Sequence, residues 1–445
     1  MSKKQTLFCG NCKEYLREEL IKESNKANGG TAFRIPSLVN ANGVLVAAID
    51  KAATGGDWGY IELAVRTSED NGDTWTDIKT IASPPARVIN TSMENTKTAF
   101  YIDPCMAVAA NGDIILLATF FPESKGFHNF KLLDKHKAAY TMYDGKKQPI
   151  IYDRDGNYYI ITDNGDVLDS KKNKTEYTVQ YPQGALYKRE EYVGNIHLNG
   201  SMGKSTVEDT KTTFGAPLKM PKRSYIYMLR SKDNGKTWSE PVDITASILT
   251  DSDGVFFAVA PGSGLTTKSG RIIMPIYTKK GTVAIYSDDN GETWKRNTAC
   301  PYTGNIDEWC LIEAPDSTLY SFGRARIYGK TPVSISYDNG ISWIKAKKAN
   351  VKAPKCQKNA MILGDRILVS HPNEKKRANG AISTGSFIKD KSGNVKGIKW
   401  DKEYIEINRG FFAYSCMCRI DDNTIGILYE DEPGSHIIFE KIVID

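Results

Sequence analysis

The sequence lacks any long apolar run. Of its 445 residues, 40% are hydrophobic and 25% are charged, and no stretch approaches the roughly 20 apolar residues that a membrane-spanning helix needs. The first residues, MSKKQTLFCGNCKEYLREEL, also lack the apolar core of a secretory signal. We therefore expect a cytoplasmic protein, or a secreted or cell-surface one if a leader was removed.

Metal-binding patterns are also scarce. The five histidines form no HExxH or other paired motif, and Cys9-x-x-Cys12 is the only CxxC among eight cysteines. A four-cysteine site would require Cys416 and Cys418 to lie beside that pair. Buried free thiols are the simpler interpretation, so we expect neither a metal nor another cofactor.

The charge is modest and mixed. The formal net charge is +6, and lysines and arginines alternate with acidic residues rather than gathering in blocks. This distribution speaks against nucleic acid as a partner. A mild positive balance favours a small anionic substrate.

One eight-residue pattern occurs four times: SEDNGDTW at 68–75, SKDNGKTW at 231–238, SDDNGETW at 287–294 and SYDNGISW at 336–343. Serine and aspartate side chains bond nearby backbone groups in turns, glycine permits a positive φ, and tryptophan offers a large face for packing. The aspartates could instead be acids or metal ligands. Identical turns placed one per repeat lie too far apart to form one site, so we interpret them as scaffold.

The spacing of the four turns indicates the fold. The last three begin 56 and 49 residues apart, which suits a four-stranded propeller blade, whereas the first two begin 163 apart. Within this long gap, residues 122–222 carry alternating aromatic and β-branched residues between Asp-Gly and Asn-Gly turns. This pattern is typical of hairpins. We predict an all-β propeller, 30–121 and 223–445, interrupted by a small β domain. Residues 1–29 should form an arm or a short helix, with helical signal at 14–24.

Besides the turns, the stretch FRIPSL at 33–38 resembles the Phe/Tyr-Arg-Ile-Pro signature of the sialidase (neuraminidase) superfamily. The turns resemble the Asp boxes of the same superfamily, and the similarity covers about 30–445. It implies a six-bladed β-propeller and a retaining exo-α-sialidase. The insertion is similar to that of larger bacterial exo-sialidases.

The resemblance implies a set of three arginines that bind the carboxylate of sialic acid, since guanidinium groups pair with carboxylates in a planar geometry that lysine lacks. Arg34 of FRIPSL matches the first, Arg324 of SFGRAR the second and Arg377 of KKRANG the third. Arg326 is a close rival to Arg324.

The resemblance also implies the catalytic groups. Asp57 in GGDWG matches the acid/base, Tyr414 in FFAYSC matches the nucleophile, and Glu308 in NIDEWC matches the glutamate that takes the proton of the tyrosine. A neutral tyrosine suits an anomeric carbon that already carries a carboxylate, because an attacking carboxylate would be repelled.

Two further positions complete the expected pocket. Asp103 in FYIDPC matches a residue near the sugar O4 and N-acetyl group. The family also has an arginine shortly after FRIP. Here that stretch reads AAIDKAAT, in which Lys51 is the cation at hand, and the departure concerns the O4 contact alone.

These residues predict hydrolysis of terminal sialic acid from glycoproteins, glycolipids or oligosaccharides by a monomer. A trans-sialidase of the same fold is the alternative. Some of those enzymes place a tryptophan over the site after the nucleophile. No tryptophan follows Tyr414, which favours hydrolysis, although Trp309 lies beside Glu308. A non-catalytic sialic-acid-binding propeller would not need Asp57, Glu308 and Tyr414 together.

Overall fold

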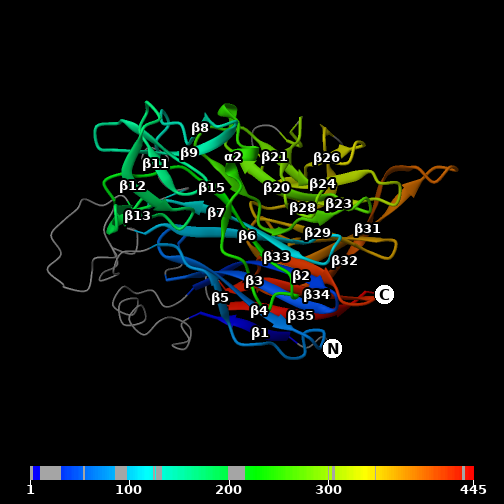
Figure 1. The fold of residues 1–445 in the computed structure, drawn as a ribbon. Helices are drawn as coiled ribbons and strands as arrows, with labels where there is room; N and C mark the ends of the chain where they lie inside the picture. The colour runs from blue at the N-terminus through cyan, green and yellow to red at the C-terminus, as the bar shows by residue number, and fades with distance from the viewer. Residues whose placement is uncertain are drawn as a thin grey trace.

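The computed structural model describes residues 4–10, 32–53, 56–85, 98–123, 126, 133–198, 216–298, 300–302, 306–345, 347–432 and 436–444. The described residues are almost entirely β-structure (Figure 1). The described residues include one short helix, α2 (Thr245–Ile248), and the 3₁₀ turn Asp251–Asp253. This is the all-β composition that the alternating sequence pattern predicts.

Six sheets form the blades of a β-propeller, as predicted, and their strand pairs are antiparallel except for β18 beside β6. The first three blades are β2 (Ala32–Ala41), β3 (Val44–Ala52), β4 (Ile61–Ser68) and β5 (Lys79–Ala82); β6 (Phe100–Val108), β7 (Ile114–Phe121), β15 (Tyr225–Ser231) and β16 (Val242–Asp243), with β18 (Gly262–Ser263) beside β6; and β17 (Phe257–Val259), β20 (Ile272–Thr278), β21 (Thr282–Ser287) and β22 (Lys295–Arg296), with β19 (Leu265–Thr266) beside β20. The last three are β23 (Ile306–Glu313), β24 (Leu319–Ala325), β26 (Val333–Ser336) and β27 (Ile344–Lys345); β29 (Asn359–Leu363), β30 (Arg366–Pro372), β31 (Ala378–Lys389) and β32 (Val395–Phe411); and β33 (Ala413–Arg419), β34 (Thr424–Glu432), β35 (His436–Val443) and β1 (Lys4–Cys9). A separate pair, β25 (Gly329–Thr331) and β28 (Ala349–Ala353), lies against the fourth and fifth blades.

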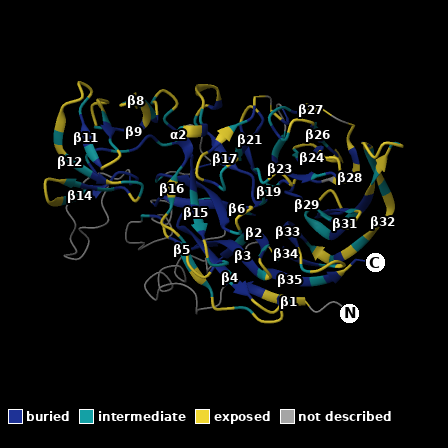
Figure 2. Cartoon of the chain, turned by 45° about the vertical axis from the view of Figure 1, so that its right-hand side comes forward, coloured by how far each residue is buried: buried dark blue, intermediate teal, exposed yellow. Residues whose placement is uncertain are grey.

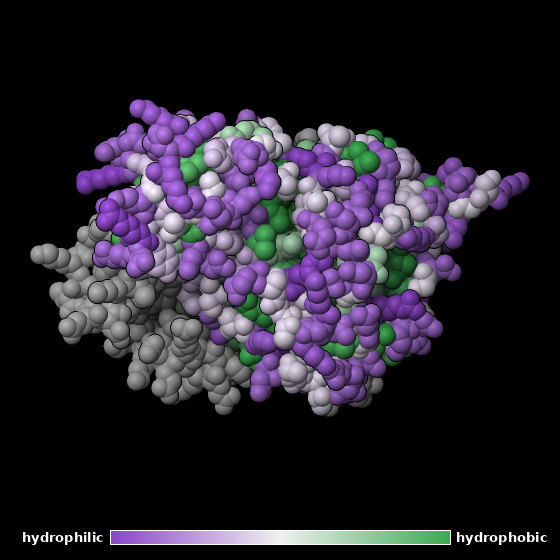
Figure 3. All heavy atoms as spheres, viewed as in Figure 1, coloured by the Kyte–Doolittle hydropathy of each residue, from purple (hydrophilic) through white to green (hydrophobic). Residues whose placement is uncertain are grey.

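Most residues of the inner strands are buried (Figure 2). Every residue of β7 is buried, and so is every residue of β6 except Val108. Their apolar side chains pack between neighbouring blades, which buries both faces of each sheet. The outer surface seen in Figure 3 is mostly hydrophilic, with small separate apolar patches.

The N-terminal strand corrects one expectation. Residues 1–29 were expected to form an arm or a helix, but β1 pairs antiparallel with β35, from Lys4 opposite Glu440 to Cys9 opposite His436. Phe8 is buried there and its ring lies 5.4 Å from that of Phe33. The first strand thus completes the last blade and covers what would otherwise be an unpaired sheet edge. The helix expected at 14–24 lies outside the described residues.

Within the predicted insertion 122–222, the structure has a seven-stranded meander. Its strands follow chain order: β8 (Tyr140–Tyr143), β9 (Lys146–Tyr152), β10 (Tyr158–Ile161), β11 (Asp166–Leu168), β12 (Lys174–Gln180), β13 (Ala185–Lys188) and β14 (Glu191–Asn195). The Asp144-Gly145 turn between β8 and β9 has positive φ at both residues, the conformation that a tight hairpin requires.

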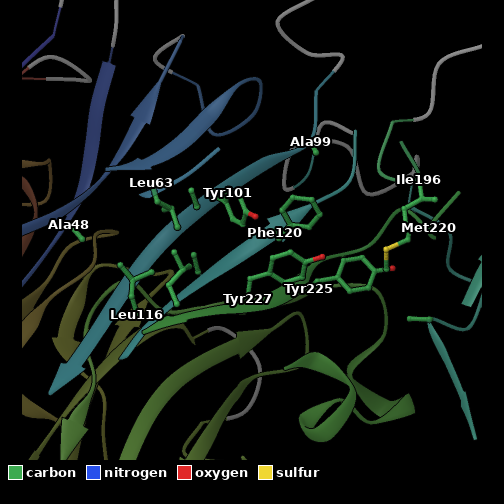
Figure 4. Packing of buried hydrophobic residues seen from close by; sticks show 14 of the residues in the cluster. Ala48, Leu63, Ala99, Tyr101, Leu116, Phe120, Ile196, Met220, Tyr225 and Tyr227 are labelled. Atoms are coloured by element: carbon green, nitrogen blue, oxygen red, sulfur yellow. The ribbon is translucent and has the colours of Figure 1, made fainter. Parts of the chain in front are cut away.

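The meander shares a hydrophobic core with the second blade (Figure 4). Met220 lies beside Tyr225 of β15, and Ile196 lies next to Met220. Phe120 stacks on Tyr227 with ring centroids 4.6 Å apart. This continuous core holds the inserted sheet against the propeller.

The four repeated turns connect the third and fourth strands of the first four blades. In the turn at 287–294, the Ser287 hydroxyl donates to Asp289 at 2.7 Å and accepts from the Gly291 amide at 2.7 Å. Asp289 also accepts from the Thr293 amide at 2.9 Å. The other three repeats form the same bonds, so their aspartates are engaged within the turns rather than directed at a shared site.

Candidate active site

The expected site residues lie at irregular points of the inner strands. Arg34 precedes a break in the β2–β3 register, and the next residue, Ile35, has a φ of 60°. Asp103 in β6 and Tyr414 in β33 also have positive φ and sit at register breaks. The β23–β24 register shifts around Glu308 as well. Bulges redirect side chains and concentrate next to active sites. The four inner strands thus bend where they present functional groups.

Ile35 is held in its strained conformation by Glu430 of β34. The Glu430 Oε1 atom accepts the Ile35 amide at 3.0 Å and lies 3.4 Å from Nε of Arg34. Glu430 is fully buried, and burial raises the pKa of its carboxyl group. One carboxylate therefore fixes both the bulge and the orientation of Arg34. Glu430 ends the stretch IGILYE at 425–430, and no local motif predicts this role for it.

At the centre of the site, Tyr414 lies between an acid and a cation. Its hydroxyl donates to Oε1 of Glu308 at 2.8 Å, and Nη1 of Arg324 donates to the same hydroxyl at 3.0 Å. Arg324 also forms a salt bridge with Oε2 of Glu308. Tyr414, on the sixth blade, and Glu308 and Arg324, on the fourth, thus form one connected group.

Two further arginines face the Tyr414 ring. The guanidinium carbon of Arg34 lies 5.5 Å from the ring centroid and that of Arg377 lies 5.2 Å from it. Among the described residues, the Arg377 guanidinium forms no hydrogen bond or salt bridge. Three positive side chains from three blades therefore surround one phenol, as the predicted carboxylate-binding set requires.

Electrostatics at Tyr414 balance two effects. Burial and the nearby Glu308 raise the pKa of its phenol well above the ordinary value of 10, whereas Arg324, Arg377 and Arg34 act in the opposite direction. Tyr414 is therefore neutral at neutral pH, and Glu308 is the carboxylate placed to accept its proton.

Asp57 lies in the connection between β3 and β4, where its carboxylate forms a salt bridge with Nη1 of Arg34. Its side chain is 37% exposed, whereas those of Arg34 and Arg324 are 14% and 12% exposed. Asp57 is thus a solvent-accessible acid at the edge of the arginine cluster.

Asp103 belongs to a second acidic group deeper in the site. The Tyr277 hydroxyl lies 3.4 Å from Oδ2 of Asp103, and the Asp103 amide lies 3.4 Å from Oδ2 of Asp50. Both aspartates are fully buried, and burial raises the pKa of each well above its ordinary value. Burial thus favours the uncharged form of both carboxyl groups. Asp50 and Tyr277 were not singled out from sequence.

Lys51 does not join these residues. It follows Asp50 on β3, so its side chain points to the other face of the sheet, where it forms a salt bridge with Glu62 at 2.9 Å and bonds Thr80 at 3.0 Å. Arg326 is also directed away from Tyr414. Its Nε and Nη2 atoms bond Asp307 at 2.9 and 2.6 Å.

Groups of three or more potential metal ligands do not occur in the described part of the chain. Cys416 and Cys418 are buried free thiols on β33, whereas Cys12 lies outside the described residues, so the four-cysteine arrangement is not tested. Within those ranges, no helix is long and apolar enough to span a membrane.

Comparison with known proteins agrees with this geometry. Residues 176–394 match the family model of the BNR repeat-like domain. The chain is 24% identical to Sialidase B of Streptococcus pneumoniae over 93% of its own length and 63% of that protein. The chain is therefore similar to sialidases over most of its length.

Solved sialidase structures have the same fold. The intramolecular trans-sialidase of Ruminococcus gnavus, in complex with oseltamivir carboxylate, superposes with a TM-score of 0.78 at 24% identity, covering 95% of this chain and 96% of that one. The leech intramolecular trans-sialidase, complexed with 2,7-anhydro-Neu5Ac, gives 0.79 at 23% identity, covering 95% and 69%. This chain thus spans less than two thirds of Sialidase B but nearly all of the Ruminococcus chain.

Proposed function

We propose that this protein is an exo-α-sialidase that releases terminal sialic acid from sialylated glycans with retention of configuration. One observation carries the proposal: the Tyr414 hydroxyl lies between Glu308 and Arg324, with Arg34 and Arg377 facing its ring. A phenol with an adjacent base suits attack on an anomeric carbon that bears a carboxylate.

The arginines bind and orient the substrate. Arg34, Arg324 and Arg377 pair with the carboxylate on the anomeric carbon, which places that carbon beside Tyr414. Asp103 and Asp50, whose pKa values are raised by burial, bond sugar hydroxyl or amide groups. The sugar therefore enters as an anion into a cluster of fixed positive charge.

In the first chemical step, Glu308 takes the phenolic proton while the Tyr414 oxygen bonds to the anomeric carbon. The glycosidic bond breaks, and Asp57 gives its proton to the departing oxygen. In the second step Asp57 accepts a proton from water, and the water oxygen bonds to the anomeric carbon. The bond to Tyr414 breaks, and the phenol regains its proton from Glu308. Two inversions give net retention.

Intramolecular transfer is the second candidate, because two structural neighbours are described as intramolecular trans-sialidases. In that reaction a hydroxyl of the bound sugar, rather than water, would attack the anomeric carbon and give an anhydro sugar. The absence of tryptophan after Tyr414 favours water as the acceptor.

Proton NMR of 3′-sialyllactose during turnover separates these outcomes. Retaining hydrolysis first produces the α-anomer of sialic acid, which then mutarotates. An early β-anomer would contradict retention, an anhydro sugar would identify intramolecular transfer, and a new glycoside would identify transfer to another glycan. No change in the substrate at any pH would contradict the proposed activity itself.

A further inference from the structure

A cavity of about 590 Å³ opens in the fourth blade next to the candidate active site. Its volume lies in the usual range of small-molecule sites. Its walls come from the ends of β23 and β24, the loop that follows β24, and the strands β25 and β27. None of the functional roles derived above uses this space.

The cavity is connected to the site through β24. Arg324 contacts Tyr414, and the next two residues, Ala325 and Arg326, line the cavity. Two residues of chain span at most about 7 Å. Arg326 also lies close enough to Tyr277 and Arg324 to interact with both electrostatically. A sugar next to one bound at Tyr414 is therefore within reach of the cavity.

The cavity wall is positively charged. Lys330, Lys345 and Lys348 line it and are exposed, and none of the described lining residues is acidic. The fourth cation, Arg326, is paired through Nε and Nη2 with Asp307 outside the lining. The three lysines thus provide positive charge that Asp307 does not offset.

Apolar groups form the rest of the surface. Tyr302 and Trp343 are buried in the wall, whereas Tyr328 and Ile327 are 42% and 74% exposed. An exposed aromatic ring beside cations suits the apolar face of a sugar whose acidic group meets the cations. Charge and shape together favour an acidic saccharide over a neutral one.

We propose that this cavity binds a second, anionic sugar of the substrate, bearing a carboxylate or a sulfate, and so gives the enzyme a preference for multiply acidic glycans. This proposal rests on the proposed sialidase activity. The lysines supply the attraction, and Tyr328 supplies the surface against which the sugar packs. A substrate with one sialic acid and no second acidic sugar gains nothing from the cavity.

The test compares three substrates: a methylumbelliferyl sialoside, α2,8-linked disialyllactose and a sulfated 3′-sialyllactose. In Lys330→Ala/Lys345→Ala/Lys348→Ala, we expect kcat/KM for the two acidic oligosaccharides to fall about tenfold, through KM, because each exposed charge contributes a few-fold. For the methylumbelliferyl sialoside, kcat/KM of the triple variant should equal that of the wild type. If kcat/KM falls for disialyllactose alone, the cavity binds a carboxylate. If it falls for the sulfated 3′-sialyllactose alone, the cavity binds a sulfate.

The matched control is Lys389→Ala/Lys399→Ala/Lys402→Ala, which removes the same charge from exposed positions of β31 and β32 and should leave all three substrates unaffected. A second variant, Tyr328→Ala, should weaken the binding of both acidic oligosaccharides. It should leave the salt dependence of that binding unchanged. Equal effects of the two triple variants would show that only net charge matters and would overturn the proposal.

Binding separates the failure of this inference from failure of the proposed activity. Titration calorimetry of disialyllactose with Tyr414→Phe, with and without the cavity triple substitution, requires no turnover. If the triple substitution leaves the dissociation constant unchanged, the cavity does not bind the second sugar, whether or not the wild type is an active sialidase. Weaker binding by the triple variant, together with no turnover of the methylumbelliferyl sialoside by the wild type, would support the cavity and contradict the sialidase proposal.

Discussion

Asp57 forms a salt bridge with Arg34. In the proposed mechanism, the substrate carboxylate must displace Asp57 from Arg34 before Asp57 can meet the glycosidic oxygen.

Asp57→Asn separates binding from protonation. Asparagine cannot compete for Arg34 as an anion, so we expect sialic acid to bind at least as tightly as to the wild type. Turnover of 3′-sialyllactose should fall by about 10²–10⁴-fold because the leaving oxygen has no proton donor. Calorimetry and initial rates measure the two effects. Turnover of a methylumbelliferyl sialoside, which has a better leaving group, should fall much less. An equal fall in turnover of both substrates would contradict an acid role for Asp57.

Tyr414→Phe tests the nucleophile. The substitution removes one hydroxyl group, so the fold and sialic-acid binding should persist while turnover falls by at least about a hundredfold. Tyr60→Phe is the matched control, since Tyr60 is also buried and donates to a glutamate, Glu62, at 2.8 Å. A fluorinated sialosyl fluoride should add mass to the Tyr414 peptide. Label on Asp57 or Glu308, or full activity of the phenylalanine variant, would refute the mechanism.

Lysine substitutions test the carboxylate site. Arg324→Lys and Arg377→Lys keep the charge but lose planar paired hydrogen bonding, so kcat/KM for a methylumbelliferyl sialoside should fall about ten- to a hundredfold. Arg326→Lys should leave this substrate unaffected because Arg326 pairs with Asp307. If Arg326→Lys lowered kcat/KM more than Arg324→Lys does, Arg326 rather than Arg324 would be the carboxylate-binding residue.

Local motifs predict much of this molecule. The repeated turns indicate propeller blades, and FRIPSL leads to Arg34, because both depend on short segments with fixed chemistry. Lys51 shows the limit of this approach. It was selected as the available cation, but the register puts Asp50 opposite Arg34 and Lys51 opposite Phe33. Only strand register decides which of two adjacent side chains faces the site.

Other features depend on contacts between distant residues. Glu430 reaches Ile35 across 395 positions of sequence, and β1 joins a blade formed by the other end of the chain. No local pattern around Lys4–Cys9 specifies its partner, since an edge strand pairs with whatever sheet edge the closed propeller presents. The buried Asp50 and Tyr277 likewise become recognisable only beside Asp103.

Asp289→Ala tests the structural role of the repeated turns. The alanine removes acceptors for Ser287 and Thr293, at an expected cost of about 1–3 kcal/mol in unfolding free energy. The Tm should fall while turnover of folded enzyme persists. Asp365→Ala, in the exposed turn between β29 and β30, is the control and should change neither. Lost activity at unchanged Tm would contradict the scaffold role.

The same turn should contribute to acid sensitivity. Hydrogen bonds from Thr293 and Ser287 hold the pKa of Asp289 at about 2 against an ordinary value of 3.8. A lowered folded-state pKa gives stability that is present above pH 4 and is lost as pH falls toward 2. The Tm difference between wild type and Asp289→Ala should therefore shrink over that interval. A difference that stays constant there would contradict this origin.

Lys358 leads to the last prediction. Its side chain is 2% exposed, and its ammonium group has no hydrogen-bond partner within the described part of the chain. Burial lowers its pKa from 10.5 to about 8, although the nearby Cys356 and Cys310 act in the opposite direction. At pH 7 the folded protein therefore carries a buried, unpaired charge, which costs stability.

The sign of the pH dependence follows from linkage. Between about pH 8 and pH 10.5 the unfolded chain binds more protons at Lys358 than the folded one, so stability rises with pH across that window. Lys358→Met removes both the cost and this dependence. We expect its Tm to exceed that of the wild type at pH 7 and the excess to shrink toward pH 10. Lys389→Met, at an exposed position, should show no such trend. An excess that does not change between pH 7 and pH 10 would mean that Lys358 is not a buried ammonium group.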